Sequence, residues 1–346
     1  MYSAGIIGAG WVAGARHIPA LQRDGRVHIA AVYDPDPARA EAAAKKFGIA
    51  TATSDLDRLL SLSTDFVSIC TPPQSHAPLT MRALEAGRHV LVEKPMAMSV
   101  HEAEAMAALA ASRNLKLCVS HNLLYSRSVR RALDALAGAG PLQHILALQL
   151  SNPNRRLPSW YHRLPGGLFF DESPHMTYLL RRFLGAFSID HVWSRTKVEQ
   201  GNDEVDFLEA RLSNGGASAN LTMGFNTPVS EWTLTLITER KIIGLDLFRD
   251  ISTVVENDGR HGPAEIMRGS LNQALQSAAG FVSSGARYTA NRQLYGHEGL
   301  ISGFVDSLEG RPTPVAIEES IAVVRTMTEL LDRAGINTRT LEQAVA

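Results

Sequence analysis

The chain has little of what marks secreted or membrane proteins. Only two of its 346 residues are cysteines, too few for a disulfide framework. Cys70 and Cys118 both lie inside apolar runs of strand length, so we expect buried free thiols in a reducing compartment. No uninterrupted apolar run approaches the roughly 20 residues of a membrane-spanning helix.

An excess of charge of one sign is also lacking. The 34 Lys and Arg residues nearly balance the 35 Asp and Glu residues, which gives a net charge of −1. With no basic block, this balance argues against a nucleic-acid or membrane-surface partner. The first residues already form a strand pattern and leave no room for a leader peptide, so we expect a cytoplasmic protein. The length and the 45% hydrophobic content predict about two domains with sizeable cores.

A glycine-rich segment follows the first apolar run. Residues 8–13 read G-A-G-W-V-A and lead into a helical pattern. Gly8 would make a tight turn, Gly10 would let a pyrophosphate approach, and the helix start would supply N–H groups to the phosphates. We therefore expect Gly8, Gly10, Trp11 and Val12 to line a dinucleotide.

An acid ends the second predicted strand. Asp34 comes 26 residues after Gly8 and is followed by Pro-Asp-Pro, with no base before Arg39. A carboxylate here accepts hydrogen bonds from the adenosine ribose and repels a 2′-phosphate. The cofactor predicted is therefore NAD, with NADP less favoured. The alternative is that Asp34 only opens an Asp-Pro turn.

Strand-like runs alternate with helical patterns up to residue 120. Ser75 and Ser99 are expected helix N-caps, the second within an S-x-x-E capping box. Strands that alternate with helices predict an α/β fold with a parallel, doubly wound sheet. The predicted strands are 2–7, 27–33, 49–53, 66–70, 88–92 and 115–120.

The strand at 88–92 ends in Glu93-Lys94-Pro95. Open α/β sheets bind their ligands outside the carboxyl ends of the strands, so we expect Glu93 and Lys94 to border the cofactor and Lys94 also to reach the substrate. A lysine at a strand end is otherwise usually a solvated charge.

Other polar residues occupy similar positions. Thr71 and Pro72 end the strand at 66–70, His76 begins the next helix, and His121 follows the sixth strand. We expect the first three to border the cofactor and His121 to border the substrate. For His76, a capping or surface role is an equally good interpretation.

The segments 5–11, 71–76 and 83–95 together resemble the glucose-fructose oxidoreductase/inositol dehydrogenase (Gfo/Idh/MocA) family. The resemblance spans essentially the whole chain, and Glu93-Lys94-Pro95 is its most specific mark. It implies an N-terminal Rossmann domain and a C-terminal α+β domain with an open mixed sheet. It also implies NAD(P)-dependent oxidation or reduction of a carbinol or ketone, usually on a sugar or cyclitol.

The pattern changes after residue 122. Strand-like runs now follow one another without helices, which predicts a largely antiparallel sheet. We expect a Rossmann domain at 1–122, on which the family packs the helix 318–334, and an α+β domain at 123–346. Helix cover for the second sheet looks short, so we expect a homo-oligomer, dimer or tetramer, through its open face. The predicted strands are 144–150, 191–198, 204–212, 217–224, 232–237, 241–246 and an edge strand at 251–256, with a helix at 262–285.

Two glycines at 166–167 lead into a helical pattern with Asp171 and His175 four residues apart, so the two share one face. Such a pair can orient a hydroxyl and move its proton. The family pattern here is G-G-x-x-x-D-x-x-x-H, and the resemblance makes His175 the acid/base and Asp171 a substrate ligand. The chain departs from it with Ser173 for a glycine and Tyr178 for an aspartate, which leaves the substrate less certain. A capping or core histidine is the alternative for His175.

The segment 152–165 is too rich in Pro and Asn for a regular element. Loops often determine substrate specificity. Aromatic rings pack well against the C–H surfaces of sugars, and an arginine guanidinium can bind a carboxylate with two hydrogen bonds. We expect Arg156, Trp160 and Arg163 to line the substrate pocket and the substrate to carry an acidic group. A solvated loop explains any single arginine equally well.

These residues predict a mechanism. Hydride moves between the carbinol carbon of a small polyol and the nicotinamide, while His175 exchanges the hydroxyl proton, Lys94 polarises the oxygen, and Asp171 orients the substrate or His175. Free histidine, with a pKa of about 6.5, suits this task better than free lysine at about 10.4. Two cations at one oxygen lower each other's pKa, so either could be the base. No metal ion is expected.

Two other functions fit the same segments. One is NAD-assisted glycoside cleavage without net redox change. The other is a sugar- or NAD-sensing regulator that has the fold but no turnover. The presence of Lys94, Asp171 and His175 together argues against the regulator, because a sensor does not need all three.

Overall fold

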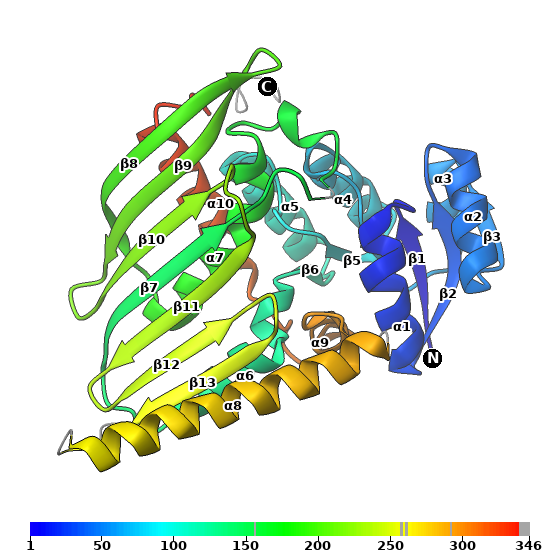
Figure 1. Cartoon of the computed structure of the whole chain (residues 1–346). Helices are drawn as coiled ribbons and strands as arrows, with labels where there is room; N and C mark the ends of the chain where they lie inside the picture. Colours follow the sequence, from blue (N-terminus) through cyan, green and yellow to red (C-terminus); the bar gives the residue numbers. More distant parts are fainter. Residues whose placement is uncertain (156, 257–258, 260–261, 291–292, 339–346) are drawn as a thin grey trace. The chain divides into compact units, whose positions relative to one another are not determined.

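The computed structural model of the chain describes residues 1–155, 157–256, 259, 262–290 and 293–338 (Figure 1). The chain divides into two compact units. Unit 1 contains Met1–Asn122 and Gly296–Thr328, and unit 2 contains Leu123–Tyr295 and Glu329–Asn337. Each unit is therefore built from separate stretches of the sequence.

Unit 1 contains a six-stranded sheet with the order β3-β2-β1-β4-β5-β6, and every pairing in it is parallel. The central strands are nearly continuous apolar runs, buried on both sides. Such runs are typical of parallel sheets covered by helices on both faces, and the predicted doubly wound sheet is confirmed. The strands are β1 (Tyr2–Ile7), β2 (Val27–Tyr33), β3 (Thr51–Thr53), β4 (Phe66–Ile69), β5 (His89–Val92) and β6 (Leu117–Val119).

Helices connect these strands. The crossover from β1 to β2 begins with a short π-helix, η1 (Ala13–His17), which runs directly into α1 (Ile18–Asp24). The other helical elements of unit 1 are α2 (Pro37–Phe47), α3 (Leu56–Ser61), the 3₁₀ turn η2 (Pro73–Ser75), α4 (His76–Glu85), α5 (Val100–Ser112) and α9 (His297–Leu308), and it includes α10 (Ile317–Arg333) up to Thr328.

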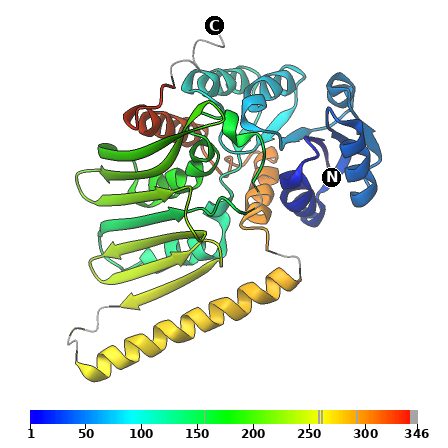
Figure 2. The same cartoon turned by 45° about the horizontal axis from the view of Figure 1, so that its top comes forward.

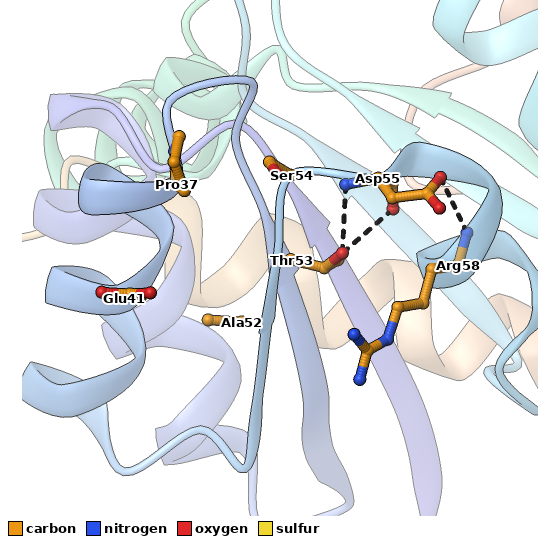
Figure 3. A pocket seen from close by; sticks show the side chains of 7 residues that line it. All are labelled: Pro37, Glu41, Ala52, Thr53, Ser54, Asp55 and Arg58. Carbon is orange, nitrogen blue, oxygen red and sulfur yellow. Dashed lines mark hydrogen bonds between the residues drawn. The ribbon is translucent and has the colours of Figure 1, made fainter.

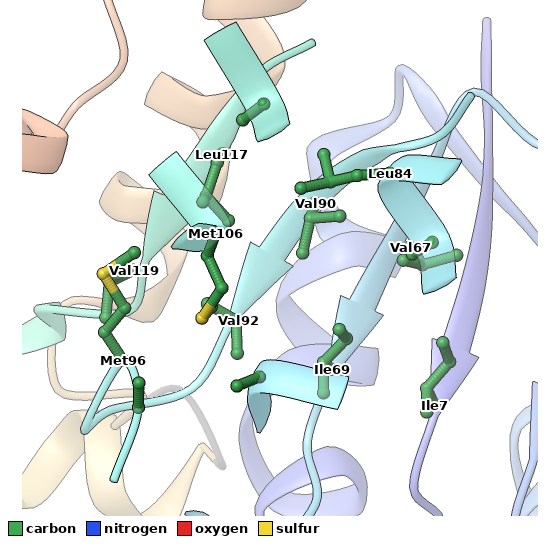
Figure 4. Packing of buried hydrophobic residues seen from close by; sticks show 14 of the residues in the cluster. Ile7, Val67, Ile69, Leu84, Val90, Val92, Met96, Met106, Leu117 and Val119 are labelled. Carbon is green, nitrogen blue, oxygen red and sulfur yellow. The ribbon is translucent and has the colours of Figure 1, made fainter. Parts of the chain in front are cut away.

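A hydrophobic cluster packs one face of this sheet against its helices (Figure 4). Val90 and Val92 of β5 meet Leu84 of α4 and Met106 of α5, and all four are fully buried. Val324 of α10 belongs to the same cluster. Unit 1 therefore uses residues more than 200 positions apart in one core.

The two predicted helix caps differ in outcome. The Ser99 hydroxyl accepts a hydrogen bond from the backbone N–H of Glu102 at 3.2 Å, as an N-cap should. Ser75 occupies the predicted N-cap position of α4 but its hydroxyl caps no N–H, because it lies 2.7 Å from both Thr71 Oγ1 and Pro72 O and donates its one proton to either of them. Ser75 is the last residue of the 3₁₀ turn before α4, and its backbone has αR angles (φ −101°, ψ −4°), whereas a capping residue normally has β-region angles.

Unit 2 contains a seven-stranded sheet with the order β13-β12-β11-β7-β10-β9-β8. Only β7 and β10 pair in parallel, so the predicted, mostly antiparallel sheet is confirmed. The strands are β7 (Leu142–Leu150), β8 (Ser188–Glu199), β9 (Asn202–Ser213), β10 (Ser218–Gly224), β11 (Glu231–Thr238), β12 (Lys241–Asp246) and β13 (Ile251–Glu256).

One face of this sheet is covered. Along β11 buried and partly exposed residues alternate strictly, as expected for a sheet with one covered face. α6 (Arg127–Leu136) packs on β12 and β13, and α7 (Leu168–Leu184) packs on β7, β9 and β10. Among the described residues no helix crosses the other face, where Leu146, Trp193 and Ile242 are roughly half exposed (Figures 1 and 2).

α8 (Pro263–Thr289) runs along the edge strand β13. It begins one residue after the start of the helix predicted at 262–285 and ends four residues beyond its end. The last connecting elements of unit 2 are the 3₁₀ turns η3 (Asn122–Tyr125), which begins in unit 1, and η4 (Tyr161–Arg163).

Candidate functional site

The glycine-rich loop after β1 has the geometry that a dinucleotide needs. Gly8 has a φ of +97°, and a Cβ there would lie 2.8 Å from Thr71 Cγ2, so only glycine fits. A Cβ on Gly10 would meet no protein atom within 4 Å, so the backbone there is open. The side chain of Trp11 is 53% exposed, and the Arg16 guanidinium lies 5.0 Å from the centre of its ring.

Asp34 is held at this loop. One carboxylate oxygen accepts a hydrogen bond from Ala9 N at 2.9 Å, and the other accepts one from Asp36 N at 3.0 Å. The second bond forms the Asp-Pro turn that was the alternative interpretation. Because a carboxylate has about four lone-pair sites, these bonds leave acceptor capacity for a ribose hydroxyl.

His76 joins two strand ends. It is fully buried, with Nε2 2.8 Å from Thr71 O and Nδ1 2.7 Å from Pro95 O. Burial lowers its pKa, although the two carbonyls oppose this, so the neutral ring donates to one carbonyl at a time. His76 thus fixes the Thr71–Pro72 turn to the Lys94–Pro95 turn, whose peptide is cis. Its contact with the cofactor stays a prediction.

Glu93 lies in a buried polar cluster. Its Oε1 is 2.7 Å from His17 Nε2 and 3.6 Å from His297 Nε2, and the three side chains are almost completely buried. His17 Nδ1 lies 2.8 Å from the Ser68 hydroxyl, which in turn is 3.6 Å from Cys70 Sγ. Both ring nitrogens of His17 therefore have an acceptor in reach.

The charges in this cluster stabilise each other. Burial alone would lower the pKa of His17, but Cys70 and Glu93 outweigh it and raise the value to about 10. Burial would raise the pKa of Glu93, but His17 and His297 hold it well below its usual range. Glu93 is therefore an anion that faces a protonated His17.

The donor set of this cluster, two histidines and a glutamate within 4.8 Å of one another, is one that zinc also uses. However, two ligands of a tetrahedral zinc lie about 3.3 Å apart, given metal–ligand distances of about 2.0 Å. The 2.7 Å between His17 and Glu93 is a hydrogen-bond distance. The cluster is thus arranged as a hydrogen-bonded ion pair, and the absence of a metal stays a prediction.

Lys94 and His121 lie beside this cluster. The second oxygen of Glu93 accepts a hydrogen bond from Lys94 N at 3.1 Å, which fixes the backbone from which the lysine side chain extends. Lys94 is partly exposed and His121 is buried. Burial lowers the pKa of His121 to about 3, in spite of the opposing charge of Glu93, so this ring is neutral.

In unit 2, α7 carries Asp171 and His175 on one face, as predicted. Gly166 and Gly167 have φ values of +70° and +62°, and a Cβ on Gly167 would lie 2.8 Å from Glu204. The tight glycine turn lets α7 begin close to β9. Asp171 and His175 are both partly exposed on a helix that is otherwise mostly buried.

Tyr178 provides a partner for His175. Its hydroxyl lies 2.7 Å from His175 Nδ1 and accepts a hydrogen bond from Leu123 N at 3.1 Å. The ring of Trp232 packs 5.3 Å from that of His175. The tyrosine that replaces the family's aspartate therefore orients the imidazole, and it does so without adding a negative charge.

Sequence reasoning missed the buried carboxylate beside Asp171. Glu172, next to Asp171, forms an ion pair with Arg155 and accepts a hydrogen bond from the Ser151 hydroxyl at 2.6 Å. Trp232 Nε1 lies 3.5 Å from the same hydroxyl. No motif marks Glu172 or Arg155, so only the fold identifies them.

The structure describes most of the predicted substrate loop, residues 152–155 and 157–165. Trp160 is partly exposed and precedes η4, and Arg163 at the end of η4 is exposed. Arg156 lies outside the described residues. Arg155, which the sequence did not single out, is the loop arginine that the structure brings to α7.

A surface pocket of about 280 Å³ lies between α2, β3 and α3 (Figure 3). Glu41, Asp55 and Arg58 give it a mixed charge. None of the predicted site residues lines it, so we assign it no part in the reaction.

Comparisons with known proteins agree with this geometry. Residues 2–121 match the family described as "Oxidoreductase family, NAD-binding Rossmann fold". A dTDP-3,4-didehydro-2,6-dideoxy-alpha-D-glucose 3-reductase from Saccharopolyspora spinosa is 31% identical over 228 residues, which are 64% of this chain and 68% of that protein. Inositol 2-dehydrogenase from Rhizobium meliloti is 31% identical over 185 residues, 52% of this chain and 54% of that enzyme.

Solved structures show the same architecture. GenD2 from gentamicin A biosynthesis, solved in complex with NAD, has a TM-score of 0.75 at 25% identity and covers 96% of this chain and 94% of its own. The WlbA dehydrogenase from Bordetella pertussis has a TM-score of 0.78 at 18% identity, with coverage of 96% and 95%. At that identity the likeness shows the fold alone. Within the described residues, every helix is too short or too polar to span a membrane.

Proposed function

Because the chain belongs to the Gfo/Idh/MocA family of NAD-binding oxidoreductases, we propose that it transfers a hydride between NAD and a carbinol or ketone carbon of a sugar-like substrate. The candidates are a sugar, an amino sugar, a sugar acid or a cyclitol. The relatives named above act on a deoxysugar nucleotide and on inositol, which supports this class of substrate.

The cofactor fits the loop of unit 1. The open backbone at Gly10 and the first turn of the continuous helix that η1 and α1 form would hold the pyrophosphate, and the remaining lone pairs of Asp34 would accept hydrogen bonds from the ribose hydroxyls. The nicotinamide supplies a hydride acceptor or donor. Preference for NAD over NADP rests on Asp34, whose charge repels a 2′-phosphate.

The arrangement at His175 carries the proposal. Its Nδ1 is held by the neutral hydroxyl of Tyr178, so the imidazole has a fixed orientation and can exchange a proton through its other nitrogen. We assign the acid/base step to His175.

Lys94 and Asp171 complete the proposed chemistry. Lys94 donates a hydrogen bond to the reacting oxygen and stabilises the negative charge that develops there, and Glu93 fixes its backbone. Asp171, one helical turn from His175, orients the substrate hydroxyl or the imidazole. Trp160 and Arg163 are proposed to border the substrate, with Arg163 facing its acidic group. His121 is proposed to border the substrate as a neutral ring beside Lys94.

The test is spectroscopic. The full chain is incubated with NAD and a panel of cyclitols, hexoses, amino sugars and sugar acids, and the absorbance of reduced nicotinamide is followed. On the substrate that responds, Lys94→Ala and His175→Asn should each lower kcat by about 10²- to 10⁴-fold with little change in NAD affinity. His144→Asn in β7, whose Nδ1 lies 2.7 Å from the Ser218 hydroxyl in the second sheet, is the control and should keep full activity.

Other outcomes would contradict the proposal. Tight NAD binding without turnover on any polyol would favour a sensing regulator. Release of a cleaved sugar without net reduction of NAD would favour NAD-assisted glycoside cleavage. If Arg163→Ala and Arg156→Ala both left kcat/KM unchanged on the true substrate, the proposed acidic group would be wrong.

We also propose a homo-oligomer that uses the open face of the second sheet. Partly exposed apolar side chains on that face, including Leu146 and Ile242, support it. A monomer in light scattering at micromolar concentration would contradict it. The buried free thiols Cys70 and Cys118 suit the cytoplasmic location expected from the sequence.

A further inference from the structure

α8 packs its polar side inward. The side-chain amide of Gln276 completes the edge of β13, because Oε1 accepts from Val254 N at 2.8 Å and Nε2 donates to Val254 O at 2.9 Å. Arg287 pairs with Asp250 at 3.1 Å. At Gly280 the helix comes so close to Ile251 that a Cβ would lie 2.6 Å from it. The edge strand is therefore covered by small and polar residues.

The opposite side of α8 is apolar and exposed. Its large side chains are between 60% and 74% exposed, and they are Met267, Leu271, Leu275, Phe281, Val282 and Tyr288. A surface helix normally turns its apolar stripe toward the core, whereas this one presents it to solvent. Single exposed apolar residues need no explanation, but a continuous stripe of this length marks an interaction site.

The spacing of this stripe is that of a coiled-coil seam. Its centre follows alternating steps of four and three residues, through Met267, Leu271, Ala274, Ala278, Phe281, Gly285 and Tyr288. On a straight helix a seam with steps of 3.5 residues on average drifts by only about 20° per heptad, so over three heptads it stays on one side of the helix. The spacing therefore fits another helix as the partner.

The small number of charged residues on α8 also favours a protein partner. α8 has only three charged residues, and Arg287 is already paired inside unit 2 while Glu265 lies in the first turn, where a carboxylate is favourable. A helix that lies on a membrane needs a Lys- and Arg-rich polar face exposed beside its apolar face. Here the polar face covers β13, so an uncharged protein surface is the better partner.

We propose that the partner is the α8 of a second copy of this chain, which packs antiparallel about a two-fold axis near Ala278. Such an axis places Leu271 of one copy opposite Gly285 of the other, so that a large side chain fills the space left by a missing one. The same axis places Ala274 of one copy opposite Val282 of the other. A two-fold interface requires this kind of self-complementarity.

The apolar stripe is large enough to form a stable interface between two copies. Six exposed side chains that each lose roughly 100 Å² give about 600 Å² per copy and about 1,200 Å² in total, the lower end of the range for stable protein–protein interfaces. This interface differs from the open sheet face and does not depend on the proposed reaction. If both surfaces pair, the protein is a tetramer.

The first experiment measures mass by light scattering on the full chain at micromolar concentration. Leu271→Glu combined with Phe281→Glu should halve the mass of the wild-type particle, since both residues are exposed in the single chain and their change leaves the fold intact. Asn272→Glu, on the same helix but outside the stripe, should leave it unchanged. A monomeric wild type, or a double variant of unchanged mass, would overturn the proposal.

The second experiment fixes the axis. Under oxidation Ala278→Cys should form a disulfide-linked dimer, because the residue lies at the axis, and the two native cysteines are buried. Asn272→Cys should not, since its two copies lie about 18 Å apart along an antiparallel pair. A cross-link at 272 and none at 278 would overturn the register. Binding of the wild type to anionic vesicles, lost in the double variant, would overturn the choice of partner.

Discussion

Each unit holds a buried glutamate next to a candidate reacting residue, and the two glutamates are neutralised differently. Glu93 precedes Lys94 and is paired with His17 and His297. Glu172 follows Asp171 and is paired with Arg155 and Ser151.

The difference lies in whether the partner can lose its charge. A guanidinium stays protonated at any pH at which the protein folds, whereas an imidazole does not. The ion pair of unit 1 is therefore sensitive to pH, and that of unit 2 depends on a partner of fixed charge. Both leave one carboxylate anchored beside a residue that we place in the reaction.

The largest expected effect comes from removing a partner of Glu93. His17→Leu leaves a buried carboxylate whose remaining partners are the Lys94 N–H and the more distant His297, and should lower the free energy of unfolding by about 3–5 kcal/mol. Arg155→Met, the matched change in unit 2, should cost less, about 1–3 kcal/mol, because Ser151 still bonds Glu172 and the arginine is partly exposed. Denaturant titration followed by circular dichroism measures the loss of unfolding free energy in both variants. Equal losses would contradict the expected difference between the two ion pairs.

The pH dependence should separate the two pairs. The pKa of His17 is raised to about 10, so its contribution to stability is complete below about pH 6.5 and is lost as the pH rises toward 10. The lowered pKa of Glu93 keeps the pair intact above about pH 4.5. The cost of His17→Leu should therefore shrink between pH 6 and pH 10, by on the order of 1 kcal/mol per pH unit.

Arg155→Met provides the control for this pH series. Its cost should stay constant from pH 6 to pH 10, since the guanidinium does not titrate there. A cost of His17→Leu that is equally constant would contradict a protonated His17.

The smallest effect is expected at Tyr178. Tyr178→Phe removes the hydroxyl that orients His175 and bonds Leu123 N, and should lower stability by about 1 kcal/mol. The same change should lower kcat about tenfold with little change in KM, because a misoriented imidazole still reacts. Steady-state kinetics on the responding substrate measures this, and an unchanged kcat would make Tyr178 a structural residue only.

Much of the fold could be predicted from the sequence because its signals are local. The apolar runs that became β4 and β5 and the alternation along β11 report burial directly. The glycines at 8 and 167 mark backbone that no other residue adopts easily. These features depend on neighbours in the chain, so a single sequence contains them.

The buried networks could not be predicted, for a physical reason. His17 and Glu93 are 76 residues apart, and Arg155 and Glu172 are 17 apart across a loop and a helix. Only the tertiary fold decides which partner a buried charge finds. Ser75 shows the same limit on a smaller scale, because a single 3₁₀ turn redirected its hydroxyl.

Unit 1 is discontinuous, and this affects how the chain folds during synthesis. All six strands of its sheet have left the ribosome once residue 122 has emerged, but His297 and Val324 come only after the long stretch Leu123–Tyr295 of unit 2. The distance from 122 to 297 is 297 − 122 = 175 residues, or roughly 10–35 s at usual rates of translation. During that interval the sheet lacks α9 and α10, and Glu93 has only one of its two histidines. The nascent Rossmann unit therefore waits, incompletely covered, while unit 2 is made.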